Sequence, residues 1–174
     1  GHDGIVLHLD ATGDTSLVYD ALEPEVMALA AAPNGDLFVG ASPEGRVYRL
    51  PGGKQPAEVY FDPEETYIWK MLAGPDGELY VATGYKGKVY KVTGPHQAKA
   101  ILESEETHII SMALDRHGNL LAGSSGGALL YEITPGGIVS IVYDSPLKDL
   151  RSIVVDSDNN LFVAAFEIKA AGEQ

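Results

Sequence analysis

The sequence predicts an all-β fold of the β-propeller type, on the basis of an internal repeat, alternating apolar residues and tight-turn dipeptides. A pattern of turn residues followed by Leu occurs four times, with its leucines at positions 37, 79, 120 and 161. This spacing of 41 or 42 residues is typical of propeller blades that are built from four strands each. The repeat therefore predicts the fold before any single element is assigned.

The third repeat shows the expected strands most clearly. Its apolar residues alternate with period two in short runs bounded by Gly, Pro, Asn or Asp, as is typical of strands joined by hairpins. The predicted strands are His108–Leu114, Leu120–Gly123, Leu129–Ile133 and Ile138–Tyr143.

The turn between the first and second strand of each repeat carries a residue pair that tolerates positive φ. In the complete repeats the pairs are Asn34-Gly35, Asp76-Gly77 and His117-Gly118. Asn159-Asn160 takes this place in the last repeat, and we expect a poorer turn there.

The repeats account for residues 1–168, in units of approximately 4–44, 45–86, 87–127 and 128–168, and residues 169–174 are expected to form a tail or linker. The chain opens with two outer strands, Gly4–Leu9 and Ser16–Tyr19, and closes with two inner strands, Leu150–Asp156 and Leu161–Ala164. This order of strands predicts three full blades with a half-blade at each end. It is compatible with a closed four-bladed ring, with part of a larger propeller, or with half of a dimeric ring.

Composition narrows the classes of function. The 174 residues include 12 basic and 25 acidic side chains, for a formal net charge of −13, and no Cys. Without Cys there is no disulfide, thiolate catalysis or iron–sulfur ligation. The excess of acidic over basic side chains disfavours a nucleic-acid partner, because phosphate binding depends on clustered Lys and Arg. No apolar run approaches the roughly 20 residues that span a bilayer.

The loops expected between one blade and the next are acidic. They hold 11 of the 25 acidic residues, namely Asp20, Glu23, Glu25, Asp62, Glu64, Glu65, Glu103, Glu105, Glu106, Asp144 and Asp149. One interpretation is an electronegative channel mouth that attracts a cation, an amine or a basic protein surface. The other is that these are solvated loop residues without a binding role.

The first residue of each innermost strand is the more specific candidate, since repeat symmetry would bring these positions toward the axis. The four copies are Glu25, Tyr67, His108 and Asp149, and the next inward slot holds Met27, Trp69, Ile110 and Arg151. A His between carboxylates suits a general base or a metal ligand, aromatic rings suit stacking, and Arg suits an anion. Alternatively, these residues only begin strands, with Trp69 packed and Arg151 paired to an acid.

The repeat resembles those of the NHL-repeat and gluconolactonase-like propeller group. Segments such as Tyr67-Ile68-Trp69, Glu106-Thr107-His108-Ile109 and Gly45-Arg46-Val47-Tyr48 look most like bacterial, often exported, propeller proteins of unassigned function. WD repeats are less similar, because the only Trp is followed by Lys70 and no Gly-His pair opens a blade. The resemblance implies a propeller with more than four blades.

The resemblance also implies a rival function. Gluconolactonase-like enzymes hold a divalent cation with carboxylate and amide oxygens and use an acidic residue as the base, and Glu25 and Asp149 are the nearest matches here. No Asn occupies an equivalent inner slot, so this match is partial.

The sequence therefore favours a non-enzymatic binding or scaffolding module, without a cofactor, for a protein or small-molecule ligand at the acidic loop face. The candidate ligand-binding residues are Glu25, Tyr67, Trp69, His108, Asp149 and Arg151. The first alternative is a metal-assisted hydrolase or lyase, with calcium as the ion, around Glu25, His108 and Asp149. The second is a self-assembling propeller fragment whose strand edges pair with another copy, as in a homodimer.

Overall fold

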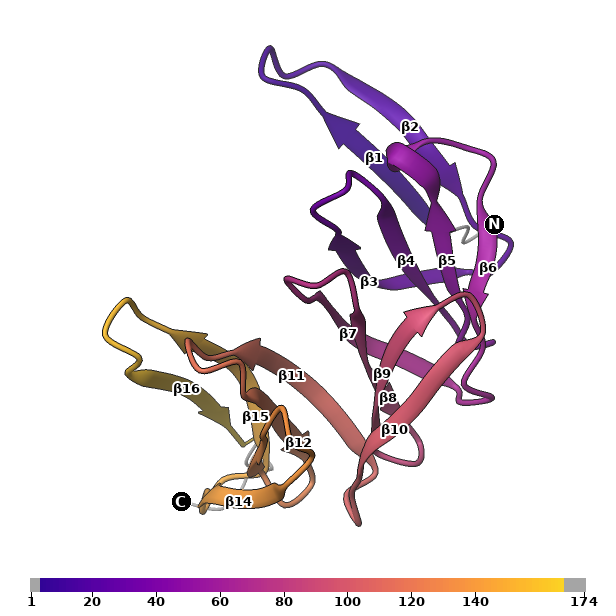
Figure 1. Cartoon of the computed structure of the whole chain (residues 1–174). Helices are drawn as coiled ribbons and strands as arrows, with labels where there is room; N and C mark the ends of the chain where they lie inside the picture. Colours follow the sequence, from indigo (N-terminus) through magenta and orange to yellow (C-terminus); the bar gives the residue numbers. More distant parts are fainter. Residues whose placement is uncertain (1–3, 168–174) are drawn as a thin grey trace, which may run out of the picture.

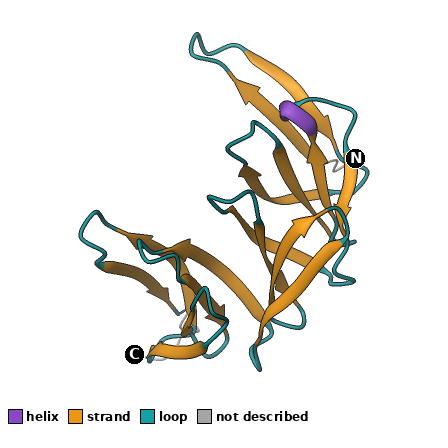
Figure 2. Cartoon of the chain, viewed as in Figure 1, coloured by secondary structure: helices purple, strands orange, loops and turns teal. Residues whose placement is uncertain are grey.

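In the computed structural model, which describes residues 4–167, the chain is an open arc of antiparallel sheets (Figure 1). Sixteen strands lie within this part of the chain, and one 3₁₀ turn, Pro51–Gly53, is the only helical element there (Figure 2). No helix among these residues has the length and apolar character needed to cross a membrane. The all-β prediction is confirmed.

Three complete four-stranded blades occupy the middle of the arc, each with its strands paired in chain order. Blade 1 is β3 (Glu25–Ala31), β4 (Leu37–Ser42), β5 (Val47–Leu50) and β6 (Glu58–Phe61). Blade 2 is β7 (Tyr67–Ala73), β8 (Leu79–Gly84), β9 (Lys88–Gly94) and β10 (Gln97–Glu103). Blade 3 is β11 (His108–Leu114), β12 (Leu120–Ser125), β13 (Leu129–Ile133) and β14 (Val139–Asp144).

A two-stranded hairpin lies at each end of the arc. The N-terminal hairpin is β1 (Ile5–Leu9) with β2 (Thr15–Asp20), and the C-terminal hairpin is β15 (Asp149–Val155) with β16 (Leu161–Phe166). Figure 1 shows the two hairpins at opposite ends of the arc, so residues 4–167 form a partial propeller and not a closed four-bladed ring. The predicted tail, 169–174, lies outside the described residues.

The four hydrophobic clusters of the core lie between successive sheets. One cluster joins blades 1 and 2, for example through Phe38, Ile68 and Met71, and a second joins blades 2 and 3. The N-terminal hairpin packs on blade 1 through Val6 and Tyr19, and a fourth cluster holds the C-terminal hairpin on blade 3. Face-to-face burial explains why strands such as β4 and β8 are apolar on both sides.

The turns between the first and second strands have one geometry in all four repeats. Gly35, Gly77 and Gly118 have φ of 89°, 87° and 81°, and Asn159 takes the equivalent place with φ of 64°. The backbone hydrogen bonds of the first turn recur in the last, where Asp156 and Asn159 donate as Ala32 and Gly35 do. Asn therefore adopts the conformation that Gly has in the other turns, in line with its tolerance of the left-handed region.

Candidate functional site

Tyr67 and Trp69 form the core of the candidate site, on the innermost strand of blade 2. They are the first and third residues of β7, so both side chains lie on one face of the strand. Their rings are stacked, with centroids 4.9 Å apart and planes 23° apart. Both side chains are half-buried, which leaves part of this aromatic surface accessible.

His108, the first residue of β11, closes the cluster from the next blade. Its ring meets Trp69 edge-on, with a centroid distance of 5.6 Å and an interplanar angle of 85°. The indole N–H of Trp69 donates to Nδ1 of His108 at 3.1 Å, and the backbone N–H of Tyr85 donates to the same atom at 3.3 Å. Since both groups are donors only, Nδ1 is the acceptor and the ring proton of neutral His108 resides on Nε2.

Burial lowers the pKa of His108 below its ordinary value of 6.5, and the negative charge of Asp149 opposes this effect. The hydrogen bonds to Nδ1 act in the same direction as burial, because a proton on Nδ1 would break both of them. His108 is therefore a neutral hydrogen-bond donor at Nε2. This arrangement is unsuited to a general base, which needs a free basic nitrogen.

Gly84 makes the approach of these side chains feasible. It pairs with Tyr67 on one side and with His108 on the other, so it lies between the two inner strands. A Cβ atom at this position would overlap Nε1 of Trp69 and Nδ1 of His108. Gly84 was not among the predicted site residues, although the sequence carried a signal: the other repeats have Ser42, Ser125 and Phe166 at its place.

Asp149 and Arg151 lie beside this cluster on β15 but interact mainly with each other. The Arg151 guanidinium is 2.8 Å from Oδ2 of Asp149, and the hydroxyl of Ser125 donates to Oδ1 at 2.6 Å. Arg151 also lies over the ring of Phe166, 5.8 Å from its centroid. The structure thus pairs the predicted anion-binding Arg with the neighbouring acid.

Glu25, the remaining predicted site residue, is exposed at the start of β3 in blade 1. Its side chain has no hydrogen bond or ion pair with another described residue in this structure. β3 packs against β7, while Asp149 is on β15, beyond β7 and β11. The structure brings Tyr67, Trp69 and His108 into contact, with Asp149 near them, and it separates Glu25 from Asp149 by two inner strands.

Two of the acidic loop residues, Glu23 and Glu65, are buried, which was not predicted from the sequence. Glu23 is 3% exposed, and the hydroxyl of Tyr48 donates to it at 2.6 Å. Burial, together with this hydrogen bond to Glu23, raises the pKa of Tyr48 to about 12. Glu65 is buried at the equivalent place of the next repeat, where Tyr90 donates to it at 3.5 Å and burial raises the pKa of its carboxyl.

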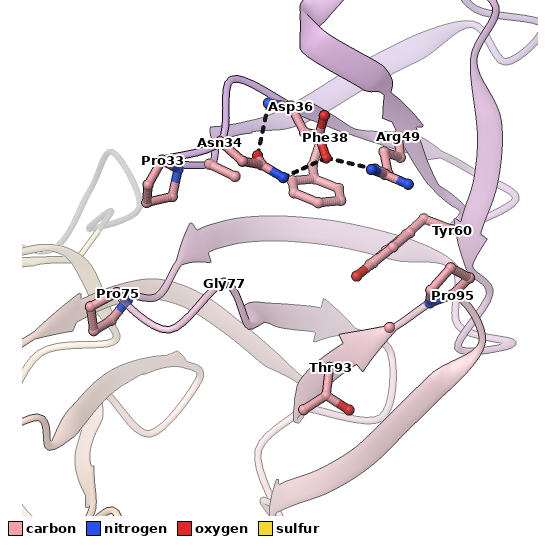
Figure 3. Close-up of a pocket in the computed structure, with 12 residues that line it drawn as sticks. Pro33, Asn34, Asp36, Phe38, Arg49, Tyr60, Pro75, Gly77, Thr93 and Pro95 are labelled. Carbon is pink, nitrogen blue, oxygen red and sulfur yellow. Dashed lines mark hydrogen bonds and ion pairs between the residues drawn. The ribbon is translucent and has the colours of Figure 1, made fainter.

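A cleft of about 350 Å³ opens between blades 1 and 2 on the opposite side of the arc, next to the turns of Asn34 and Gly77 (Figure 3). Its central charge, Asp36, accepts hydrogen bonds from Asn34 at 2.9 Å, from Arg49 at 2.7 Å and from the backbone N–H of Gly52 at 2.8 Å. These partners all belong to blade 1, and they hold its loops in place at the cleft. They also use the acceptor capacity of the carboxylate, so the cleft offers no unpaired charged group to a ligand.

The described residues contain no group of three or more His, Asp or Glu side chains in an arrangement that could hold a metal ion. The predicted trio of Glu25, His108 and Asp149 does not form such a group, because β7 and β11 lie between β3, which carries Glu25, and β15, which carries Asp149, and because Nδ1 of His108 is occupied.

Comparison with solved structures assigns the fold to the β-propeller class. No protein-family model matches the chain, and no curated protein matches its sequence. A virginiamycin B lyase from Staphylococcus aureus, solved with quinupristin, matches with a TM-score of 0.81 and 14% identity over 93% of this chain and 56% of that one.

Other propellers match over similar lengths. A nidogen–laminin complex gives a TM-score of 0.73 at 11% identity, over 91% of this chain and 65% of that one. A gluconolactonase from Xanthomonas campestris gives 0.66 at 18% identity, over 91% and 61%. This chain therefore spans about 56–65% of the length of these structures. The resemblance to gluconolactonase-like propellers is confirmed for the fold.

Proposed function

We propose that this chain is a non-catalytic binding module that takes a flat ring at the cluster of Tyr67, Trp69 and His108. The observation that supports it is the hydrogen bond from Trp69 to Nδ1 of His108, which fixes an aromatic surface beside a neutral donor. A ligand with a planar or sugar-like ring and an acceptor oxygen at its edge suits this chemistry, because the ring stacks and the oxygen accepts from Nε2.

The fold by itself does not favour a reaction, since its structural neighbours include lyases, a gluconolactonase and a nidogen complex. The metal-assisted alternative requires Glu25 and Asp149 to share one ion, but β7 and β11 lie between the strands that these residues begin, β3 and β15. His108 as a base would have to give up the two donors at Nδ1. These points favour binding over hydrolysis.

Trp69 is the only Trp in the chain, so its fluorescence reports on the proposed site alone. The test is a titration of the protein with a panel of aromatic and sugar-ring compounds, with Trp69 emission as the readout. We expect a saturable change with at least one ring compound and its loss in His108→Ala. A panel that leaves the emission of the folded protein unchanged would contradict the proposal.

The rival function has its own measurement on the same samples. Turnover of a lactone that requires calcium and is lost in Glu25→Ala and Asp149→Ala would replace the binding proposal with the metal-assisted one. We expect no turnover with or without calcium.

A further inference from the structure

The two ends of the arc expose apolar side chains that the middle of the arc buries. The exposed large apolar residues on strands lie almost wholly on β1–β3 and on β14–β16: Ile5, Leu7, Leu9, Leu17, Met27, Leu29, Val139, Ile141, Val142, Tyr143, Val154, Leu161, Phe162 and Phe166. Blades 1–3 contribute only Val59 elsewhere on a strand. Concentrated apolar surface of this kind marks an interaction site.

Repeat-equivalent positions give the sharpest comparison at the N-terminal end. Leu29 on β3 is 49% exposed. Its equivalents on the later innermost strands, Met71, Met112 and Ile153, are 2%, 3% and 7% exposed. Leu9 on β1 is 65% exposed, whereas its equivalents are at most 3% exposed: Leu50, Val92 and Ile133. Each exposed position therefore lacks the preceding strands that cover its equivalents.

The C-terminal end shows the same contrast for the opposite strands. Phe162 on β16 is 58% exposed, while its equivalents are 0–7% exposed: Phe38, Tyr80 and Leu121. Tyr143 on β14 is 47% exposed, while its equivalents are 5–8% exposed: Tyr19, Phe61 and Leu102. The sheet of β15 and β16 has no third and fourth strands to cover these side chains.

The two ends are complementary, because each has the half of a blade that the other lacks. The N-terminal hairpin, β1–β2, corresponds to the third and fourth strands of a blade, and the C-terminal hairpin, β15–β16, corresponds to the first and second. Among residues 4–167, β1 pairs only with β2, and β16 pairs only with β15, so no described strand occupies the other edge of either one. The second and third strands of a complete blade are joined through these same two edges.

The free edges also lack the charges that usually protect an edge from pairing. Neither Ile5–Leu9 nor Leu161–Phe166 contains Lys, Arg, Asp, Glu or Pro. The outer edge strands of complete blades differ: β6 carries Glu58, and β10 carries Lys99 and Glu103. In a chain of net charge −13, two uncharged edges are the places where copies approach with the least repulsion.

We infer that a second copy of this chain covers these faces, with β16 of one copy paired antiparallel to β1 of the next in a composite blade. The register follows from the three complete blades, which pair Leu37 with Leu50, Leu79 with Val92 and Leu120 with Ile133. The equivalent composite pairs are Leu161 with Leu9, Phe162 with His8 and Val163 with Leu7.

Because the two joined surfaces differ, the contact is head-to-tail. Such contacts give a ring where the rotation closes and an open chain of copies where it does not. Two copies joined twice would make a ring of six complete and two composite blades. This assembly is independent of the ligand site proposed above, which lies within blades 2 and 3.

The absence of Cys allows a direct test of the register. His8→Cys and Phe162→Cys alter exposed side chains, and opposed residues in the composite blade would place their Cβ atoms about 4.5–5.5 Å apart. That is close to the range of a disulfide. Mixing the two single variants, one of them tagged, under mild oxidation is expected to give a disulfide-linked heterodimer.

Ser16→Cys is the matched control for His8→Cys. Ser16 is exposed and lies directly across from His8 on β2, one strand farther from the proposed partner, or about 10 Å from Phe162. Ser16→Cys mixed with Phe162→Cys is expected to give no heterodimer above background. Equal cross-linking by His8→Cys and Ser16→Cys would overturn the register and the proposal.

Light scattering on the unmodified chain over a dilution series gives an independent test. We expect a mass of at least twice 18.5 kDa that falls on dilution. Leu7→Lys, at a 54% exposed position, should reduce it to the monomer, and Leu22→Lys, at a 93% exposed loop position, should not. A monomer at all concentrations for the folded, unmodified chain would overturn the proposal.

Discussion

The two faces of the arc differ in how closely the blades repeat one another. This difference distinguishes residues that every blade needs from residues that belong to one site. The turn face, which carries the turns between first and second strands, repeats one structure. Asp115 accepts two backbone hydrogen bonds at 2.8 Å within its turn, and Asp156 accepts two at the same distance within the last.

The opposite face, called the mouth face here, carries the loops between second and third strands and those between blades. Part of this face repeats, since Tyr48 donates to Glu23 and Tyr90 donates to Glu65 at equivalent places. The first residues of the inner strands diverge, and they are Glu25, Tyr67, His108 and Asp149. Repetition thus marks what the fold requires of each blade. The cluster of Tyr67, Trp69 and His108 lies where the repeats differ. Among the described residues it occurs only at the junction of blades 2 and 3.

The largest expected effect comes from glycine at the mouth face. Gly87 has φ of 56°, and a Cβ there would overlap the carbonyl oxygen of Glu106 in the next interblade loop. Gly87→Ala should lower the free energy of unfolding by about 3 kcal/mol, from backbone strain and overpacking together. Urea unfolding measures this.

Gly35→Ala is the matched control on the turn face. Gly35 also has positive φ, 89°, but no atom lies within 4 Å of the added Cβ. Gly35→Ala should lower the free energy of unfolding by about 1–2 kcal/mol, from the left-handed conformation alone. Equal losses for the two variants would mean that close loop packing does not distinguish the faces.

Tyr48→Phe should have the next largest effect. It removes the hydrogen bond to the buried Glu23 carboxylate, whose other oxygen has no hydrogen-bond partner among the described residues. Loss of a hydrogen bond to a buried charged group costs about 2 kcal/mol. The control is Tyr60→Phe, because Tyr60 is also buried and its hydroxyl has no bonded partner among the described residues; we expect a change within about 0.5 kcal/mol.

His108→Gln should remove a pH dependence of stability. The unfolded chain protonates His108 near pH 6.5, whereas the folded chain does so only at lower pH because burial lowers its pKa. As the pH falls below 6.5, the unfolded state binds the proton first and the native state loses stability.

The measurement is the urea midpoint of both proteins at pH 7.5 and pH 5.5. The wild-type midpoint should fall more than that of His108→Gln, whose amide oxygen can still accept from Trp69. An equal fall in both proteins would show that His108 titrates normally and would weaken the assigned hydrogen bonds at Nδ1.

The smallest effect is expected at the fourth turn. Asn159→Gly relieves the positive φ but loses the hydrogen bond from the backbone N–H of Arg116 to the Asn159 side chain, at 2.9 Å. The two changes should offset each other to within about 0.5 kcal/mol. Asn159→Ala loses the hydrogen bond and keeps the strain, so thermal unfolding should rank it clearly below Asn159→Gly.

Much of the fold could be predicted because each blade repeats local information. The predicted boundaries of His108–Leu114 and Leu129–Ile133 match β11 and β13, and the turn glycines have the expected positive φ. Other strand ends moved by one or two residues; β12, for instance, continues to Ser125. Pairing with neighbouring strands, which local sequence does not report, sets those ends.

The candidate site was predictable only in part. Repeat symmetry identified Tyr67, Trp69 and His108 as neighbours around an axis, but it also placed Glu25 beside Asp149, as in a closed ring, whereas β7 and β11 separate their strands. The role of Gly84 and the burial of Glu23 and Glu65 were not foreseen, since both depend on contacts between different blades.

The sequence by itself determined the all-β class, the period of the blade, the turn geometry and the half-blades at the two ends, because these depend on residue spacing and on backbone preferences. Tertiary structure alone decided that the arc stays open, that Trp69 donates to His108 and that Asp149 pairs with Arg151. The physical reason is that spacing along the chain fixes which residues share a strand face, whereas the packing of one sheet on the next fixes which side chains meet.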